Sequence, residues 1–241
     1  MTIDNFDRLG KLIIQKDLVT KKANDDSFWK IELVRRKKDN DEFKSSQLIA
    51  SYNVHSYDEL IEKKELIVSI CNATGARAYM SINRRSEHQA ALDMMVKLST
   101  LLASNAKFYM KTIYESVMSS TKVPHEKRLL IDADDLSRDE VIDLIRIVDD
   151  CTNTLTLREG CQLLPEALID GLLRYKYTND DNDRFYDNAI CCVPTPHGWH
   201  VISKVFDQEK FGYKCIERFG NTFDVHSNNI ALLYYNKDDE E

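Results

Sequence analysis

The sequence has little of what makes a chain irregular, repetitive or membrane-bound. Only 7 of its 241 residues are glycine and 4 are proline, which argues against a linker-rich or low-complexity protein. No apolar run approaches the roughly 20 residues that a membrane span needs. The stretch from Met1 to Asp7 lacks the basic and then apolar pattern of a secretory signal. We therefore expect a reducing, cytoplasmic compartment and no membrane association.

Cysteine pairs and positive charge are also scarce. The 6 cysteines include no C-x-x-C pair, which argues against a zinc ribbon and favours small buried apolar residues. A net charge of −7 excludes a protein that coats duplex DNA by charge alone. The net charge does not exclude a local basic groove, for which Arg35–Lys38 and the pair Arg84 and Arg85 are candidates. The acidic run 238–241 is interpreted as a solvated tail.

Strand-like and helix-like patterns alternate along the chain. This intermixed order predicts an α+β (α/β) fold, a mixed β-sheet flanked by helices. We divide the single domain into an N-terminal α/β portion, 1–125, a core, 126–235, and the acidic tail, 236–241. Periodicity and capping signals place strands near 28–34, 47–54, 77–85, 128–134, 189–193, 199–203 and 230–235, and helices near 4–20, 57–73, 87–103, 106–119, 138–150, 158–177 and 208–218.

Two acidic residues follow an apolar run in the stretch 128–135, whose sequence is RLLIDADD. The run Leu-Leu-Ile is typical of a strand that is buried on both faces. Residues two apart on a strand share a face, so Asp132 and Asp134 are expected to lie side by side. Paired carboxylates repel each other unless a cation lies between them, and oxygen ligands suit Mg²⁺ or Mn²⁺. The plainer alternative is a strand that leads into an Asp-rich helix cap.

A tight turn with several potential ligand-binding groups covers 194–200, whose sequence is PTPHGWH. Glycine at 198 permits close backbone approach, and Thr195 and His200 can donate hydrogen bonds to phosphate oxygens. Lys204 is four positions past His200 and shares its strand face. The alternative is a hairpin with a surface histidine. If His200 faces a ligand, its replacement by alanine should change stability by only about 0.5 kcal/mol.

Together these motifs resemble the archaeo-eukaryotic primase superfamily, including its primase-polymerase members. That family has an apolar strand ending in Asp-x-Asp, then a small residue, any residue and His, and then an Asp after an apolar position. The matching stretches are 130–134, 198–200 and 223–224, within a region of about 126–235. The chain departs from the family in the long interval between Asp134 and His200, and in the weak strand character around Asp224.

The resemblance implies a metal-dependent nucleotidyltransferase that adds nucleotides from NTP or dNTP to a 3′-hydroxyl. Asp132, Asp134 and Asp224 would be catalytic and would hold Mg²⁺ or Mn²⁺. The nucleotide triphosphate would contact Thr195, Gly198, His200, Lys204, Arg84 and Arg85. Single-stranded or primed nucleic acid is the implied partner, with Arg35–Lys38 and Trp199 as contacts.

Two other functions stay open. The chain can have the same fold without polymerase activity and serve as a nucleotide-binding, nucleic-acid-binding or interaction protein. It can also be a metal-dependent nuclease or phosphohydrolase that uses water as the nucleophile. The location of Asp132, Asp134, Asp224 and His200 discriminates between them, since an enzyme needs them in one cleft. We therefore expect the 128–134 strand to pair with the 191–203 hairpin, with the turn-proximal end beside the carboxylates.

Overall fold

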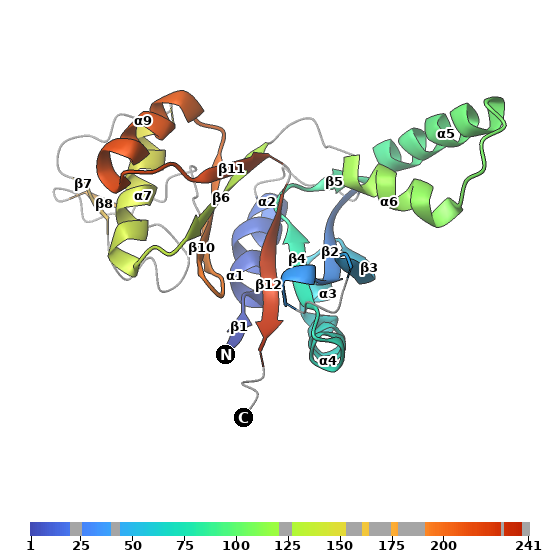
Figure 1. Ribbon diagram of the computed structural model, residues 1–241, viewed down its shortest axis with the longest axis horizontal. Helices are drawn as coiled ribbons and strands as arrows, with labels where there is room; N and C mark the ends of the chain where they lie inside the picture. The colour runs from blue at the N-terminus through green and yellow to red at the C-terminus, as the bar shows by residue number, and fades with distance from the viewer. Residues whose placement is uncertain are drawn as a thin grey trace.

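The computed structural model describes residues 1–19, 26–39, 44–120, 127–152, 161–163, 175–177, 191–227 and 229–237 (Figure 1). It shows two antiparallel β-sheets with helices packed against them, which is an α+β architecture. Within these ranges, no helix combines the length and apolar character needed to cross a membrane.

The first sheet is built mainly from the N-terminal half of the chain. Its strand order is β1 (Thr2–Asp4), β12 (Ile230–Asn236), β4 (Arg77–Ser81), β2 (Ser27–Arg35) and β3 (Gln47–Val54), and β5 (Arg85–Ser86) pairs with β2. The last strand of the chain, β12, lies between β1 and β4. The first sheet therefore contains strands from both portions of the chain, because β12 begins in the portion 126–235 and pairs with strands of the portion 1–125.

The second sheet contains the two sequence motifs. Its order is β11 (Asp224–Ser227), β6 (Arg128–Asp134), β10 (Gly198–Lys204) and β9 (Cys191–Pro194). The expected pairing of the 128–134 strand with the hairpin is confirmed, because β10 pairs with both β6 and β9. A separate pair is formed by β7 (Cys161–Leu163) and β8 (Tyr175–Tyr177).

Helices cover these sheets and fill the space between them. The segment formed by α1 (Phe6–Leu9), the π-helical η1 (Gly10–Gln15) and α2 (Lys16–Val19) lies between the sheets (Figure 1), and its apolar residues share one core with both. The first sheet is flanked by α3 (Tyr57–Glu62) and α4 (Lys64–Thr74), and α5 (Glu87–Ala103) and α6 (Met110–Ser120) form a projecting hairpin. The second sheet packs against α7 (Arg138–Cys151) and α9 (Gln208–Phe219).

The apolar run of β6 is buried on both faces, as its sequence predicts. Leu129 and Ile131 pack against the α7 and α9 layer, whereas Leu130 packs in the core shared with the first sheet. Because side chains alternate along a strand, Asp132 and Asp134 follow Leu130 onto the face that looks toward the first sheet. The carboxylates therefore lie where the apolar core between the sheets ends.

Two predictions of secondary structure are wrong. The helix near 158–177 is contradicted by β7 and β8, the described parts of that range, because short apolar runs do not separate helix from strand. The strand expected near 77–85 ends at Ser81, and Arg85 and Ser86 form the separate short strand β5. The acidic run 238–241 lies outside the described residues.

Candidate functional site

Three motif residues lie in one row across the second sheet. In the strand register, Asp132 of β6 is directly opposite His200 of β10 on one side and Asp224 of β11 on the other. Directly opposite residues of antiparallel strands place their side chains on the same face, with Cβ atoms about 4.5–5.5 Å apart. Asp134 is in turn opposite Gly198. Asp132, Asp134 and His200 therefore share the face of the second sheet that looks toward the first sheet.

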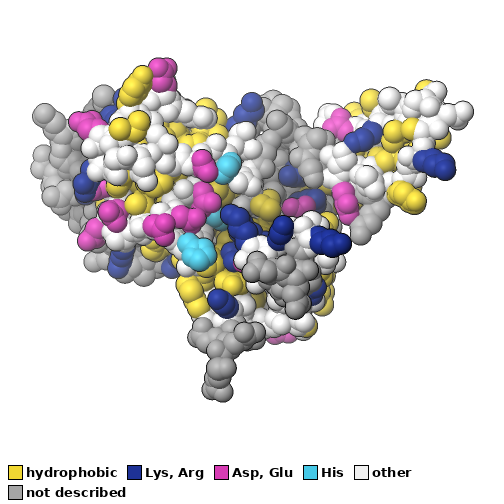
Figure 2. Space-filling view, in the orientation of Figure 1, with side chains coloured by type: hydrophobic (Ala, Val, Ile, Leu, Met, Phe, Trp, Pro, Cys, Tyr) yellow, Lys and Arg dark blue, Asp and Glu magenta, His cyan; other side chains and the backbone are white. Residues whose placement is uncertain are grey.

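A pocket opens between the two sheets at this row. The second sheet and its turn contribute carboxylate, imidazole and hydroxyl groups, and the first sheet with its 3₁₀ turn η2 (Lys37–Asp39) contributes basic groups. Figure 2 shows Lys and Arg side chains beside acidic side chains and histidines on this face. The lining residues used below are Asp132, Asp134, Thr195 and His200 on one wall and Arg36, Lys38, Asp39, Arg77 and Tyr79 on the other.

His200 is held in one tautomer by a contact from the first sheet. Its Nδ1 accepts a hydrogen bond from the backbone N–H of Leu232 at 3.1 Å, which places the imidazole proton on Nε2. Burial lowers the pKa of His200 to about 4, outweighing the opposite effect of Asp134. A neutral Nε2–H therefore faces the pocket, 3.6 Å from Asp132 Oδ1, a distance that is a close contact rather than a hydrogen bond.

The carboxylate pair is suited to a cation. Burial raises the pKa of Asp134, and the negative charge of Asp132 raises it further. A divalent ion beside both groups would reverse this effect, because the ion favours the charged form of each carboxylate.

A full protein cage for such an ion is absent from the described residues, where no three His, Cys, Asp or Glu side chains form a metal-binding group. Mg²⁺ commonly takes only one or two carboxylates and completes its shell with water and substrate phosphates. Asp132 and Asp134 fit that kind of site, which is completed by a phosphorylated substrate.

The turn between β9 and β10 contributes one unsatisfied group. Thr195 is 8% exposed and lines the pocket, and its hydroxyl has no hydrogen-bond partner within the described ranges. Its backbone N–H donates to the carbonyl of Gly198 at 2.9 Å, which closes the turn. Buried polar groups are almost always hydrogen-bonded. The Thr195 hydroxyl is therefore free to bond to an oxygen atom of a ligand or of water in the pocket.

Gly198 is required by packing rather than by contact with a phosphate. A Cβ atom at this position would lie 2.2 Å from the carbonyl oxygen of Ala133 and 2.8 Å from Cα of Asp134. Only glycine lets β10 approach β6 this closely. The small residue of the G-x-H motif thus fixes the distance between the strand that carries the carboxylates and the strand that carries His200, and Gly198 itself does not line the pocket.

The basic wall comes from the end of β2 and from β4. Arg77 donates to both carboxylate oxygens of Asp39 and stacks on the ring of Tyr235, 4.2 Å from its centre. Arg36 donates to the hydroxyl of Tyr79 at 3.3 Å. No carboxylate of the described ranges lies within ion-pair distance of Arg36 or Lys38. These two cations are therefore available to an anionic ligand.

Four of the predicted nucleotide or metal contacts lie elsewhere. Arg84 is buried with its guanidinium 3.7 Å from Asp17, and Arg85 is buried in β5, where desolvation lowers its pKa. Lys204 is opposite Arg128 at the far end of β10, about 13 Å along the strand from His200. Asp224 neighbours Asp132 but is exposed and does not line the pocket.

These differences have physical reasons. Arg84 and Arg85 follow β4, and both are buried there: Arg84 lies beside the carboxylate of Asp17, and Arg85 is part of β5. Trp199, which sequence reasoning offered as a base contact, lies on the opposite face of β10 and packs in the α7 and α9 layer. Strand parity places it there, because its neighbour His200 faces the pocket.

Sequence reasoning assigned the basic cluster at 35–38 to nucleic acid and missed Arg77 and Tyr79. The only signal for Arg36 and Lys38 was the cluster itself, and nothing in the sequence shows that β2 ends opposite the carboxylates. No protein-family model, curated protein or solved structure matches this chain.

Proposed function

We propose that the protein is a metal-dependent nucleotidyltransferase of the primase-polymerase type, which adds nucleotides from NTP or dNTP to a nucleic-acid 3′-hydroxyl. The observation that supports this proposal is the pocket between the sheets. One wall carries the carboxylate pair Asp132 and Asp134, and the other carries the cations Arg36 and Lys38. A metal-bound triphosphate needs both kinds of group at once.

Each side chain has a role that follows from its chemistry. Arg36 and Lys38 would pair with phosphate oxygens, and the Nε2–H of His200 and the hydroxyl of Thr195 would donate to them. Asp132 and Asp134 would hold Mg²⁺ or Mn²⁺, with the exposed Asp224 as a neighbour that joins them only if its side chain turns inward. The bound ion would lower the pKa of the 3′-hydroxyl and stabilise the charge of the leaving pyrophosphate.

The metal can be tested apart from catalysis. We expect Mn²⁺ to bind the wild-type protein together with a nucleoside triphosphate, and the Asp132→Asn, Asp134→Asn double variant to lose that binding. Asp224→Asn should change the affinity for Mn²⁺ far less, since Asp224 does not line the pocket. Isothermal titration measures both, and equal Mn²⁺ binding by wild type and the double variant would contradict the proposal.

The decisive experiment measures nucleotide incorporation on a primed single-stranded template with Mg²⁺ or Mn²⁺. Asp132→Asn should reduce incorporation about 100-fold or more, since even outer-shell changes at metal sites cost 10- to 100-fold. Asp135→Asn is the matched control, because Asp135 is exposed, does not line the pocket and has a φ of 62° that asparagine tolerates.

Two outcomes would favour the other functions. Nucleotide binding without incorporation by the wild-type protein would favour an inactive nucleotide- or nucleic-acid-binding protein, for which the lack of a three-ligand metal group within the described ranges is the supporting observation. Metal-dependent shortening of the primer or template would instead favour a nuclease or phosphohydrolase.

A further inference from the structure

The α5–α6 hairpin exposes an unusual amount of apolar surface. It projects from the body of the protein (Figure 1), and its two helices pack on each other around Ala90, Ile113 and Val117. Eleven large apolar side chains are exposed among the described residues, and six of them lie in this hairpin: Leu92, Met95, Val96, Leu102, Tyr109 and Met110. Concentrated exposure of this kind marks an interaction surface rather than scattered surface residues.

The apolar surface of α5 is too wide for a helix that packs on one neighbour. Its inner face, represented by Ala90, Met94 and Leu98, lies in the cluster with α6. Its polar stripe is narrow and is occupied by contacts within the hairpin, where Gln89 donates to Asp93 at 2.8 Å and Lys97 donates to Ser116. At about 100° per residue, the outer face, opposite the cluster with α6, is mainly apolar, with Ser99 and His88 as its polar members. A helix that is apolar on two faces is buried on two faces.

The outer face has the spacing of a helix-pairing seam. Leu92, Met95, Ser99 and Leu102 follow one another at intervals of three, four and three residues, which is the heptad pattern of a coiled coil. No charged side chain interrupts this seam. The spacing therefore indicates that the missing neighbour is another helix.

We infer that a second copy of this chain covers the seam, with the two α5 helices packed antiparallel in a two-fold dimer. An antiparallel pair centred beside residue 97 sets Leu92 against Leu102 of the second copy and Met95 against Ser99 of the second copy. Leucine thus packs against leucine at the two ends of the seam, and the long Met95 packs against the short Ser99 in the middle. This alternation closes the seam without a gap. Antiparallel helices also bring opposite dipole ends together.

Charge at the two ends of the hairpin supports this arrangement. The base of α5 carries Glu87, whose side chain contacts His55 and is still 53% exposed, and the tip carries the exposed Lys107. In the antiparallel pair, Glu87 of each copy faces the tip with Lys107 of the other. A parallel pair would instead set Glu87 against Glu87. Because the hairpin projects (Figure 1), the antiparallel arrangement keeps the two bodies at opposite ends of the helix pair.

Sedimentation equilibrium over roughly 1–100 µM protein tests the dimer, a range that covers interfaces of modest area. We expect the wild-type chain to dimerise and Met95→Lys or Ser99→Glu to raise the dissociation constant about tenfold or more, because each places an unpaired charge in the seam. Both positions are exposed in the monomer, so the fold is retained, which circular dichroism checks. An equimolar mixture of the two variants should associate again, since the new Lys and Glu oppose each other.

The matched control is Ile216→Lys on α9, where a large apolar side chain is 53% exposed outside the hairpin. It should leave the dimer unchanged. A wild-type chain that stays monomeric over the whole concentration range would overturn the inference. The partner of the seam would then be a helix of another protein. A dimer that Met95→Lys does not weaken would overturn it as well, by placing the contact elsewhere.

Discussion

The Nδ1 atom of His200 accepts a hydrogen bond from the backbone N–H of Leu232 at 3.1 Å. His200 belongs to the second sheet and Leu232 to the first, so this bond joins the two walls of the pocket. It also orients the ring so that Nε2–H points to the side where Asp132 lies, 3.6 Å away. One side chain therefore has a structural role through one nitrogen and is available to a ligand through the other.

This double role changes the expectation for His200→Ala. The sequence suggests an exposed histidine with little effect on stability, but the side chain is only 12% exposed. Removing the ring leaves the Leu232 N–H without its acceptor, which costs about 1–3 kcal/mol. We expect His200→Ala to lower the free energy of unfolding by this amount, measured by urea denaturation, and to weaken nucleotide binding as well.

His200→Asn separates the two roles. The Asn carbonyl oxygen can occupy the position of Nδ1 and accept from Leu232 N–H, but no donor replaces Nε2–H. We expect stability close to wild type together with loss of nucleotide affinity in a titration. If His200→Asn binds nucleotide as tightly as wild type, His200 is a structural histidine and has no ligand role.

Gly198 provides a second test, this time of the spacing between β6 and β10. Gly198→Ala places a Cβ atom 2.2 Å from the carbonyl oxygen of Ala133, so the strands must separate. Overpacking of this kind costs about 1–3 kcal/mol or more, and urea denaturation should show it. The matched control is Gly212→Ala in α9, where no atom lies within 4 Å of the new Cβ. That change should instead stabilise the protein by up to about 1 kcal/mol, and equal effects of the two substitutions would contradict this account.

The two cations of the basic wall allow a third test. We expect Arg36→Ala and Lys38→Ala each to weaken nucleoside triphosphate binding about 10- to 100-fold, since a charged hydrogen bond contributes about 1.5–3 kcal/mol. Lys37→Ala is the control, because Lys37 lies in the same turn but does not line the pocket. Fluorescence titration with a labelled nucleotide measures all three. A Lys37→Ala effect as large as the other two would show that only general positive charge matters.

The sequence predicts the second sheet better than the first. The apolar run Leu129 to Ile131 and the turn at Gly198 are local signals, and together they predict a buried strand beside a hairpin, which the structure confirms. The basic wall depends instead on long-range pairing, because β12 returns from the end of the chain to lie beside β4. No local pattern encodes that return, so the placement of Arg77 and Tyr79 opposite Asp132 could not be predicted.

Residue type alone also gives the wrong location for two buried arginines. The resemblance to the primase superfamily placed Arg84 and Arg85, at the end of the strand expected near 77–85, at a phosphate. Both are buried instead. Asp17 lies beside Arg84 and also accepts from Arg128 at 3.0 Å, so it neutralises charge at the start of β6. An ion pair of this kind depends on partners from distant parts of the chain, which a reading of local sequence does not bring together.

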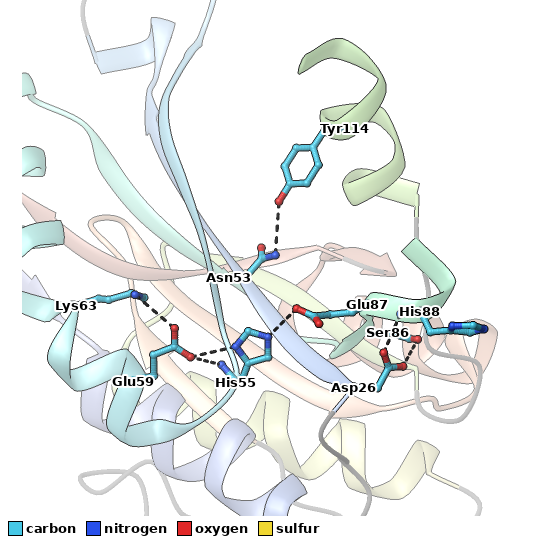
Figure 3. A network of polar contacts seen from close by, with 9 residues as sticks. All are labelled: Asp26, Asn53, His55, Glu59, Lys63, Ser86, Glu87, His88 and Tyr114. Carbon is cyan, nitrogen blue, oxygen red and sulfur yellow. Dashed lines mark hydrogen bonds and ion pairs between the residues drawn. The ribbon is translucent and has the colours of Figure 1, made fainter. Parts of the chain in front are cut away.

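The base of the α5–α6 hairpin predicts a pH dependence of stability. His55 contacts Glu59 through Nδ1 at 3.1 Å and Glu87 through Nε2 at 2.9 Å (Figure 3). Burial lowers the pKa of His55, but the hydrogen bonds to Glu87 and Glu59 outweigh it, and the pKa is raised above its ordinary value. Both ring nitrogens can donate only when the imidazole is protonated. The contact that joins the body to α5 is therefore strongest in the acid form.

The sign of the effect follows from proton linkage. With a folded-state pKa above the unfolded value of about 6.5, the folded protein binds more protons, so stability falls as pH rises through this interval. We expect the stability difference between wild type and His55→Gln, measured by urea denaturation, to be largest below about pH 6.5 and to disappear as pH rises through the folded-state pKa. His88→Gln is the control for replacing a histidine of the same region, because His88 lies on the first turn of α5 with an exposed side chain. A wild-type advantage over His55→Gln that grows with rising pH would contradict the assigned contacts.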